Sequence, residues 1–278
     1  MNKICDLHTH STFSDGTFTP TQLVEEAVRI GLSAVALSDH NTVAGLPEFL
    51  AAAEGKPILA VPAVELSTEH NGHELHIVGL FLPVEHFADV TEFVDLPRRR
   101  KEESNRALVQ ALTEAGYPLD YEEIKCQSAG YVNRANIAAA MVKKGYVAST
   151  KEAFDGLLSE EMGDYTPPKR LSAVEAIEFL RAVGAVPVWA HPYLSVPADD
   201  VPAIAKEANA HGLVGIETRY ATYTPEQTAA ACRVAQQLEL KESGGSDFHG
   251  ANKPKIQLGR GLGDLCVPYA FAQTLKEA

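Results

Sequence analysis

Histidine and carboxylate side chains stand at or beside the apolar runs of this sequence, in positions where they could bind metal ions. His8 and His10 follow the first run, and Asp247 and His249 repeat the same spacing near the end of the chain. Side chains two residues apart in a strand lie on one face, so each pair can bind one ion. The other candidate ligands are single residues, namely Asp15, His40, Glu65, His76 and His191.

Imidazole and carboxylate ligands together suit Mn, Fe or Zn. A divalent ion lowers the pKa of bound water to about 7, and two or more ions also neutralise charge on a phosphate. Glu65 is suited to bridge such ions. The pattern therefore predicts a hydrolase with two or three divalent ions, with manganese favoured and iron or zinc as alternatives.

Short β-rich runs alternate with helical patterns and must position these side chains. The runs lie near 33–37, 58–64, 74–82, 186–190, 213–218 and 241–246. Thr19-Pro20 is a good helix start, and Gly31 is a good stop. Such alternation favours a mostly parallel α/β sheet or barrel. In an α/β barrel the ends of successive strands gather at one rim, where catalytic groups are usually found.

The segment 97–170 differs in sequence pattern from the rest of the chain, because it has helical patterns and few β runs. We therefore expect an α/β catalytic barrel formed by 1–96 and 171–278, and a helical insertion at 97–170 that covers its rim. Arg134, Lys169 and Arg170 lie within the insertion or at its edge. Arg binds phosphate through a planar pair of donors and Lys as a point charge, so Arg134 and Lys169 are candidate phosphate anchors. Solvated basic side chains are the open alternative.

Composition limits the class of protein. The chain has 278 residues, 45% of them hydrophobic, and a formal net charge of −13. This charge argues against a protein that depends on non-specific contacts with a nucleic-acid backbone. The four cysteines have no zinc or disulfide spacing, and neither a signal peptide nor a membrane span is evident. We expect a cytoplasmic enzyme for a small phosphorylated substrate, without an obligate protein partner or a membrane.

The chain resembles the polymerase and histidinol phosphatase (PHP) family over nearly its whole length. The resemblance rests on Asp6-Leu7-His8-Thr9-His10-Ser11, Asp15-Gly16, Leu37-Ser38-Asp39-His40, Glu65, His76, His191-Pro192 and Ser246-Asp247-Phe248-His249. It implies a distorted (β/α)7 barrel with two or three metal ions at the rim. It also implies three ligand groups: His8, His10, Glu65 and Asp247; Glu65, His76 and His191; and Asp15, His40 and His249. Family members often have His at the position of Asp15.

Within the family, the chain is similar to a bacterial branch that hydrolyses phosphomonoesters of nucleotides. That branch usually shows Gly-Arg-Pro-His where this chain reads Asn133-Arg134-Ala135-Asn136. Arg134 is kept, and Asn136 could donate a hydrogen bond to a phosphate oxygen. The resemblance implies a phosphatase for nucleoside 3′,5′-bisphosphates such as 3′-phosphoadenosine 5′-phosphate, with His191 or Asp247 as a proton shuttle. The alternatives are a 5′-3′ exoribonuclease for short RNA, a histidinol-phosphate phosphatase, and a non-catalytic accessory domain.

Overall fold

The computed structural model describes residues 3–127, 132–159 and 166–278. The chain forms two compact units. The first comprises Met1–Val94 and Leu171–Ala278, and the second comprises Asp95–Arg170. The expected covering of the rim by the second unit stays a prediction.

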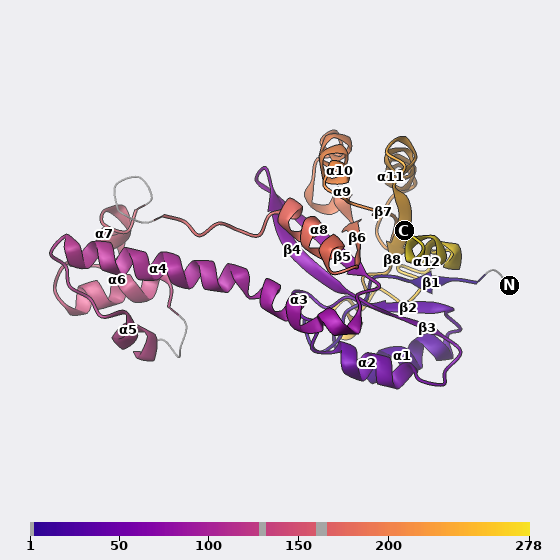
Figure 1. The fold of residues 1–278 in the computed structure, drawn as a ribbon, viewed down its shortest axis with the longest axis horizontal. Helices are drawn as coiled ribbons and strands as arrows, with labels where there is room; N and C mark the ends of the chain where they lie inside the picture. The colour runs from indigo at the N-terminus through magenta and orange to yellow at the C-terminus, as the bar shows by residue number, and fades with distance from the viewer. Residues whose placement is uncertain (1–2, 128–131, 160–165) are drawn as a thin grey trace. The chain divides into compact units, whose positions relative to one another are not determined.

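The first unit contains two sheets (Figure 1). The smaller sheet is parallel and has the order β1 (Cys5–Asp6), β2 (Ala34–Leu37), β3 (Leu59–Pro62). The larger sheet has the order β4 (Val64–His70), β5 (His73–Leu80), β6 (Val186–Ala190), β7 (Gly215–Tyr220), β8 (Lys241–Gly245). β5 is antiparallel to both of its neighbours, whereas β6, β7 and β8 run parallel.

The two sheets are connected by isolated bridges where strands end. Thr9 bridges Phe248, and His40 bridges Glu65, both in the parallel sense. Within the described residues the strand ladders form two sheets rather than one closed cylinder. The fold is therefore mixed α/β, as predicted, and closure into a (β/α)7 barrel stays a prediction.

The run 58–64 contains a break that its apolar composition does not reveal. β3 ends at Pro62, and Glu65 is the second residue of β4. β4 and β5 form a hairpin in which His70 pairs with His73. Its turn residues Asn71 and Gly72 have φ angles of 50° and 82°, which suits the tight turns that match strand twist. Glu65 thus lies in an antiparallel hairpin and not at the end of a parallel strand.

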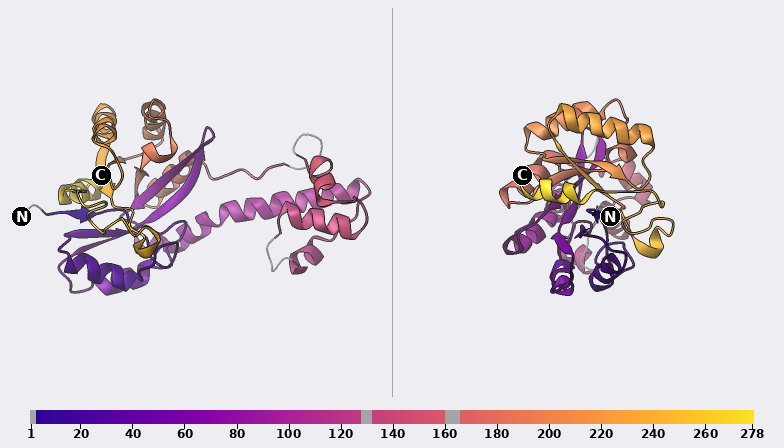
Figure 2. Two further views of the ribbon diagram at one scale, coloured as in Figure 1. Left: turned by 180° about the vertical axis from the view of Figure 1, so that it is seen from behind. Right: turned by 90° about the vertical axis from the view of Figure 1, so that its right-hand side faces the viewer.

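Helices cover the outer faces of the sheets. α1 (Pro20–Arg29) begins at the expected N-cap, because the Thr19 side chain accepts from Gln22 N. α1 and α2 (Leu46–Ala53) lie side by side beneath the smaller sheet (Figures 1 and 2). α8 (Ala173–Ala182) packs against β4, β5 and β6, α11 (Pro225–Gln237) against β7, and α12 (Tyr269–Lys276) against β8. The other helices of this unit are η1 (Val84–His86), α3 (Phe87–Val94), α9 (Pro192–Ser195), α10 (Val201–Ala210) and η2 (Gly250–Asn252).

The strands β2 and β6 are apolar and buried on both faces, where they contact two hydrophobic clusters. In β2, Val35 and Leu37 belong to the cluster that includes side chains of α1 and α2, whereas Ala34 and Ala36 belong to the second cluster. Strands buried on both faces read as continuous apolar runs, which is why the sequence indicated them. The packed strands form a rigid base for the polar residues that follow them.

The second unit is helical and has its own core. It comprises α4 (Leu96–Glu114), α5 (Tyr121–Gln127), α6 (Arg134–Lys143) and α7 (Thr150–Asp155). Leu108, Leu112, Ile137 and Met141 are buried in this core. None of the helices within the described ranges has the length and apolar character needed to span a membrane.

Candidate metal centre

Most of the predicted ligands follow the ends of strands, and two lie within a β-hairpin. His8 and His10 follow β1, His40 follows β2, and His191 follows β6. Asp247 and His249 follow β8, while Glu65 and His76 lie within the β4–β5 hairpin. The hairpin register places His76 opposite Ser67, two residues after Glu65. All of these side chains converge on one place.

Glu65 lies at the middle of the cluster and is fully buried. Its Oε1 atom is within 3.0 Å of two imidazole nitrogens, His76 Nδ1 and His191 Nε2. Its Oε2 atom is within 3.2 Å of three others, namely His8 Nε2, His10 Nε2 and His40 Nδ1. The two oxygens of one carboxylate therefore face different sets of histidines, which is the arrangement of a bridging ligand.

Two further carboxylates complete the cluster. Asp247 Oδ1 lies 3.2 Å from His10 Nε2 and 3.7 Å from His8 Nε2. Asp15 Oδ1 lies 3.1 Å from His249 Nε2, on the more exposed side. Each of four sets has ligand atoms within 4.8 Å of one another: His10, Asp15, His40 and His249; His8, Glu65 and His191; His8, His10 and Asp247; and His40, Glu65 and His76. The role of each residue as a metal ligand remains a prediction.

Several of these atoms are buried without any hydrogen-bond partner. They are His8 Nε2, His10 Nδ1 and Nε2, His40 Nδ1 and Glu65 Oε2. A buried polar atom that is left unpaired costs about 1–3 kcal/mol, so such atoms require a partner. Divalent cations would satisfy all of them together, and the mixture of imidazole and carboxylate suits Mn, Fe or Zn. The residues present therefore fit the predicted ions.

Charge within the cluster shifts several pKa values. Burial alone would lower the pKa of His8, but the Glu65 and Glu217 carboxylates raise it well above its ordinary range. Burial alone would raise the pKa of Glu65, but His8 and the surrounding imidazoles hold it well below its usual value. Burial lowers the pKa of His40 to about 4. The metal-free site is thus anionic enough to retain protons on some histidines, and cations would compete with those protons.

Two site residues have backbone angles that are unusual for side chains other than glycine. His191 has a φ of 31°, and Asp247 has a φ of 55°. His191 comes directly after β6, and Asp247 is the second residue after β8. Left-handed conformations cost of order 1 kcal/mol and concentrate at functional sites. Here both residues with such angles have side chains that contact Glu65 or the histidines around it.

Glu217, which is buried in β7, belongs to the site but was not predicted from the sequence. Its Oε1 atom lies 2.9 Å from His8 Nδ1, and its Oε2 atom accepts from His191 N at 2.6 Å. The available signal was a carboxylate in the middle of the apolar run 213–218. Carboxylates that hold the far nitrogen of a ligating histidine fix its tautomer and orientation. Glu217 can act in this way on His8.

Tyr220 and Lys253 were also missed. The Tyr220 hydroxyl donates to Asp247 Oδ2 at 2.7 Å, and Lys253 Nζ donates to the same oxygen at 2.6 Å. Asp247 Oδ1 is left to face His8 and His10. The two donors therefore fix which oxygen of Asp247 points toward the centre.

Asp6 and Asp39 belong to the sequence motifs, but they support loops instead of joining the cluster. Asp6 is fully buried and accepts from Ser246 N at 2.8 Å and Gly259 N at 2.7 Å. Asp39 accepts from Ser11 N at 2.7 Å and from Ser14 Oγ at 2.6 Å. Each carboxylate thus ties together segments that carry the predicted ligands.

The predicted phosphate-binding residues all belong to the second unit. Arg134 begins α6, and its Nη1 atom donates to Leu158 O at 3.3 Å. Asn136 completes a capping box, because its Oδ1 atom accepts from Asn133 N at 2.9 Å. Lys169 lines a separate surface pocket of the second unit. Their roles toward phosphate remain predictions.

The fold and the cluster are those of a metal-dependent phosphoesterase. The chain belongs to the PHP domain family, whose profile matches residues 6–160. A 5′-3′ exoribonuclease of Haemophilus influenzae is 33% identical over 90% of this chain and 91% of its own length. A 3′,5′-nucleoside bisphosphate phosphatase of Chromobacterium violaceum is 27% identical over 95% of this chain and 94% of its own.

Solved structures agree with this assignment. A proposed metal-dependent phosphoesterase from Bifidobacterium adolescentis is 27% identical and covers 98% of this chain and 95% of its own, with a TM-score of 0.63. An amidohydrolase from Chromobacterium violaceum, solved with sulfate and no metal, is 25% identical with a TM-score of 0.65. It covers 98% of this chain and 96% of its own. The protein is therefore a hydrolase of the PHP family.

Proposed function

We propose that this phosphoesterase releases phosphate from nucleoside 3′,5′-bisphosphates and leaves a nucleoside monophosphate. The assignment to hydrolysis of phosphate esters rests on the surroundings of Glu65, a buried carboxylate whose two oxygens face five imidazole nitrogens. The 27% identity to a bisphosphate phosphatase over nearly both whole chains supports the substrate class. The net charge of −13 also favours a small substrate over a long polyanion.

The residues of the chain have separate tasks in this proposal. His8, His10, Asp15, His40, Glu65, His76, His191, Asp247 and His249 would hold two or three divalent ions. When bound, such ions lower the pKa of water and neutralise charge on a phosphoryl group. Glu217 holds His8, while Tyr220 and Lys253 hold Asp247, so the centre keeps its geometry. Arg134 and Lys169, with Asn136, would bind substrate phosphate.

Proton transfer to the leaving oxygen is assigned to His191 or Asp247. Burial would raise the pKa of Asp247, but the close contact with His10 and the charges of His8, His10 and Lys253 hold it well below its usual value. An ionised Asp247 accepts protons before it can donate them. His191 can serve as the donor only through a nitrogen that holds no ion, and its Nε2 atom lies 3.0 Å from Glu65 Oε1.

The second candidate is a 5′-3′ exoribonuclease for short RNA. Two relatives with this name, from Haemophilus influenzae and Salmonella typhimurium, are 33% and 32% identical to this chain over at least 90% of its length. A 5′-phosphorylated RNA and a 3′,5′-bisphosphate share a nucleotide with a 5′-phosphate and a 3′-phosphoester. The same centre could therefore hydrolyse either one.

The test is to measure phosphate release from adenosine 3′,5′-bisphosphate by Mn-loaded protein, with a short 5′-phosphorylated RNA in parallel. We expect faster turnover of the bisphosphate, and a Glu65→Gln variant should be inactive on both. Faster RNA cleavage would replace the leading proposal by the second candidate. No hydrolysis of either substrate would contradict both.

A further inference from the structure

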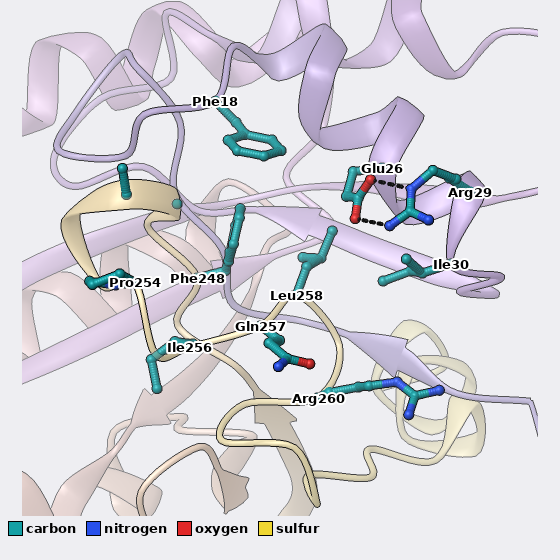
Figure 3. Close-up of a pocket in the computed structure, with 12 residues that line it drawn as sticks. Phe18, Glu26, Arg29, Ile30, Phe248, Pro254, Ile256, Gln257, Leu258 and Arg260 are labelled. Atoms are coloured by element: carbon teal, nitrogen blue, oxygen red, sulfur yellow. Dashed lines mark hydrogen bonds and ion pairs between the residues drawn. The ribbon is translucent and has the colours of Figure 1, made fainter.

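A pocket of about 520 Å³ lies in the first unit, outside the set of predicted ligands (Figure 3). It is bounded by Phe18, by the end of α1, and by the segment 248–260. Figure 3 shows the pair Glu26 and Arg29 on the α1 side, and Gln257 and Arg260 on the loop that follows η2. The volume is within the usual range for small-molecule sites.

The lining of the pocket has an apolar part and a cationic part. Phe18 and Phe248 form an edge-to-face pair with ring centroids 5.1 Å apart, and Ile256 and Leu258 extend this surface. A flat ring can pack on such a surface with aromatic contacts worth about 0.5–1.5 kcal/mol beyond burial.

The two arginines of the pocket differ in their partners. Arg29 is neutralised by Glu26 through two hydrogen bonds of 2.6 Å. Arg260 makes no ion pair or side-chain hydrogen bond within residues 3–127, 132–159 and 166–278. Its five donors are arranged to match a phosphate or carboxylate. Gln257, on the same loop, adds an amide donor.

The walls of this pocket are joined to segments that carry predicted metal ligands. Phe248 stands between Asp247 and His249 in the chain. Gly259 N donates to the Asp6 carboxylate. The same carboxylate accepts from the backbone N of Ser246, which is the residue before Asp247. Next to Phe18 in the chain, Thr17 Oγ1 accepts from Ala251 N at 2.8 Å. A ligand here would therefore contact two loops that the metal centre also needs in place.

The space between those loops is restricted. Gly250 has a φ of 63°, and a Cβ atom at this position would lie 2.1 Å from Thr17 Oγ1. Asn252 Nδ2 donates to Asp15 O at 2.7 Å. The loop that carries Asp15 and the loop that carries His249 are thus packed together beside the pocket, and movement of one must affect the other.

We propose that this pocket binds a nucleoside monophosphate, with the base on Phe248 and Leu258 and the phosphate at Arg260. A free phosphate would leave the apolar surface uncovered, and an uncharged ring would leave Arg260 without a counter-charge. Occupancy would hold the loops of Asp15, Asp247 and His249 and so strengthen metal binding. The effect of the bound nucleotide on hydrolysis rests on the proposed function, whereas the binding of the nucleotide to this pocket does not.

The experiment is an NMR titration of the full-length, ¹⁵N-labelled protein with adenosine 5′-monophosphate, with Zn²⁺ bound and again after treatment with EDTA. The backbone amides of Gly259 and Gly261 report on the pocket loop. We expect saturable shifts in both states. Adenosine and ribose 5-phosphate, titrated separately, should each bind at least about tenfold more weakly, because each lacks one half of the contacts.

Two variants on the same loop provide a matched comparison. Arg260→Gln should weaken nucleotide binding about tenfold or more. Lys255→Gln removes the same charge from an exposed residue that does not line the pocket, and it should leave binding unchanged. Binding of adenosine monophosphate should also raise the affinity of the wild-type protein for Mn²⁺ in calorimetry.

Three results would overturn the proposal. They are unshifted Gly259 and Gly261 amides at saturating nucleotide, equal binding by Arg260→Gln and wild type, and equal binding of ribose 5-phosphate and the nucleotide. These results are independent of the phosphatase assay, which measures phosphate release by Mn-loaded protein without added monophosphate. Failure of one proposal can therefore be distinguished from failure of the other.

Discussion

Glu217 binds the nitrogen of His8 that faces away from Glu65. The Oε1 atom of Glu217 lies 2.9 Å from His8 Nδ1, while His8 Nε2 lies 3.1 Å from Glu65. One imidazole is thus held between two buried carboxylates. The other oxygen of Glu217 accepts from the backbone of His191, so a single side chain positions two predicted ligands.

Glu217→Gln should weaken Mn²⁺ binding roughly 10- to 100-fold, which is typical when a carboxylate behind a ligating histidine is lost. The amide keeps the size of the side chain but supplies less negative charge to His8. Calorimetry with Mn²⁺ measures the change. Glu207→Gln, at an exposed position on α10, is the control. Wild-type affinity in Glu217→Gln would show that Glu217 does not support the centre.

Gly245→Ala should disturb the centre although Gly245 is not a predicted ligand. A Cβ atom there would lie 2.3 Å from His8 Cβ and 2.6 Å from His8 N. We expect a loss of about 1–3 kcal/mol in the free energy of unfolding from overpacking, together with weaker metal binding. Chemical denaturation and Mn²⁺ calorimetry test the two effects.

The control for this substitution is Gly55→Ala. Gly55 has a φ of 71° but faces open space, so alanine there should cost of order 1 kcal/mol in strain and leave metal affinity unchanged. If both variants bound Mn²⁺ like the wild type, the close packing of Gly245 on His8 would be irrelevant to the site.

Metal binding should release protons near neutral pH. The pKa values of His8 and His10 are raised in the metal-free cluster, for His10 because the Asp247 and Glu65 carboxylates outweigh the opposing effect of burial. Metal ligation requires neutral imidazole. Calorimetry in two buffers of different ionisation enthalpy should therefore detect proton release, and the apparent affinity for Mn²⁺ should rise with pH.

The same shifts predict how the stability of metal-free protein depends on pH. Because the folded pKa of His8 is raised, its contribution is complete below the unfolded value of about 6.5 and is lost as pH rises through the folded pKa. The increase in Tm caused by Mn²⁺ should therefore grow as the pH rises above about 6.5. A constant increase would contradict the proton competition.

Asp15 should be the most easily replaced ligand. Its side chain is 56% exposed, and its nearest predicted co-ligand is His249, at 3.1 Å. Asp15→Ala should lower the number of Mn²⁺ ions bound per chain by one without a large change in Tm. Asp15→His should restore that ion, because imidazole is also a ligand for these metals. Elemental analysis after gel filtration measures the number, and an unchanged number in Asp15→Ala would exclude this residue as a ligand.

Substitution of Asn136 can separate a structural role from a role in substrate binding. Asn136→Asp keeps an oxygen to accept from Asn133 N, so the capping box and the Tm should persist. The added negative charge should raise KM several-fold if phosphate binds at this residue. Asn136→Ala should instead lower stability by about 0.5–1 kcal/mol through loss of the cap. An unchanged KM in Asn136→Asp would assign Asn136 to helix capping alone.

The amino-acid sequence by itself indicated the α/β class, the strand runs and the residue types of the centre. This was possible because these signals are local. Strands buried on both faces leave continuous apolar runs, and the Thr19-Pro20 pair caps a helix within four residues of chain. The order of the histidines and carboxylates was also sufficient to indicate the PHP family.

Only the tertiary structure decided which atoms meet. Glu217 is 209 residues away from His8 in the chain, and no local pattern joins them. The break between β3 and β4 places Glu65 at the middle of the cluster. This break depends on the pairing of β4 with β5. The pocket behind Phe248 likewise needs α1 and the segment 248–260 side by side. Long-range packing and register fixed these relationships, because each depends on surfaces that no single segment of the sequence contains.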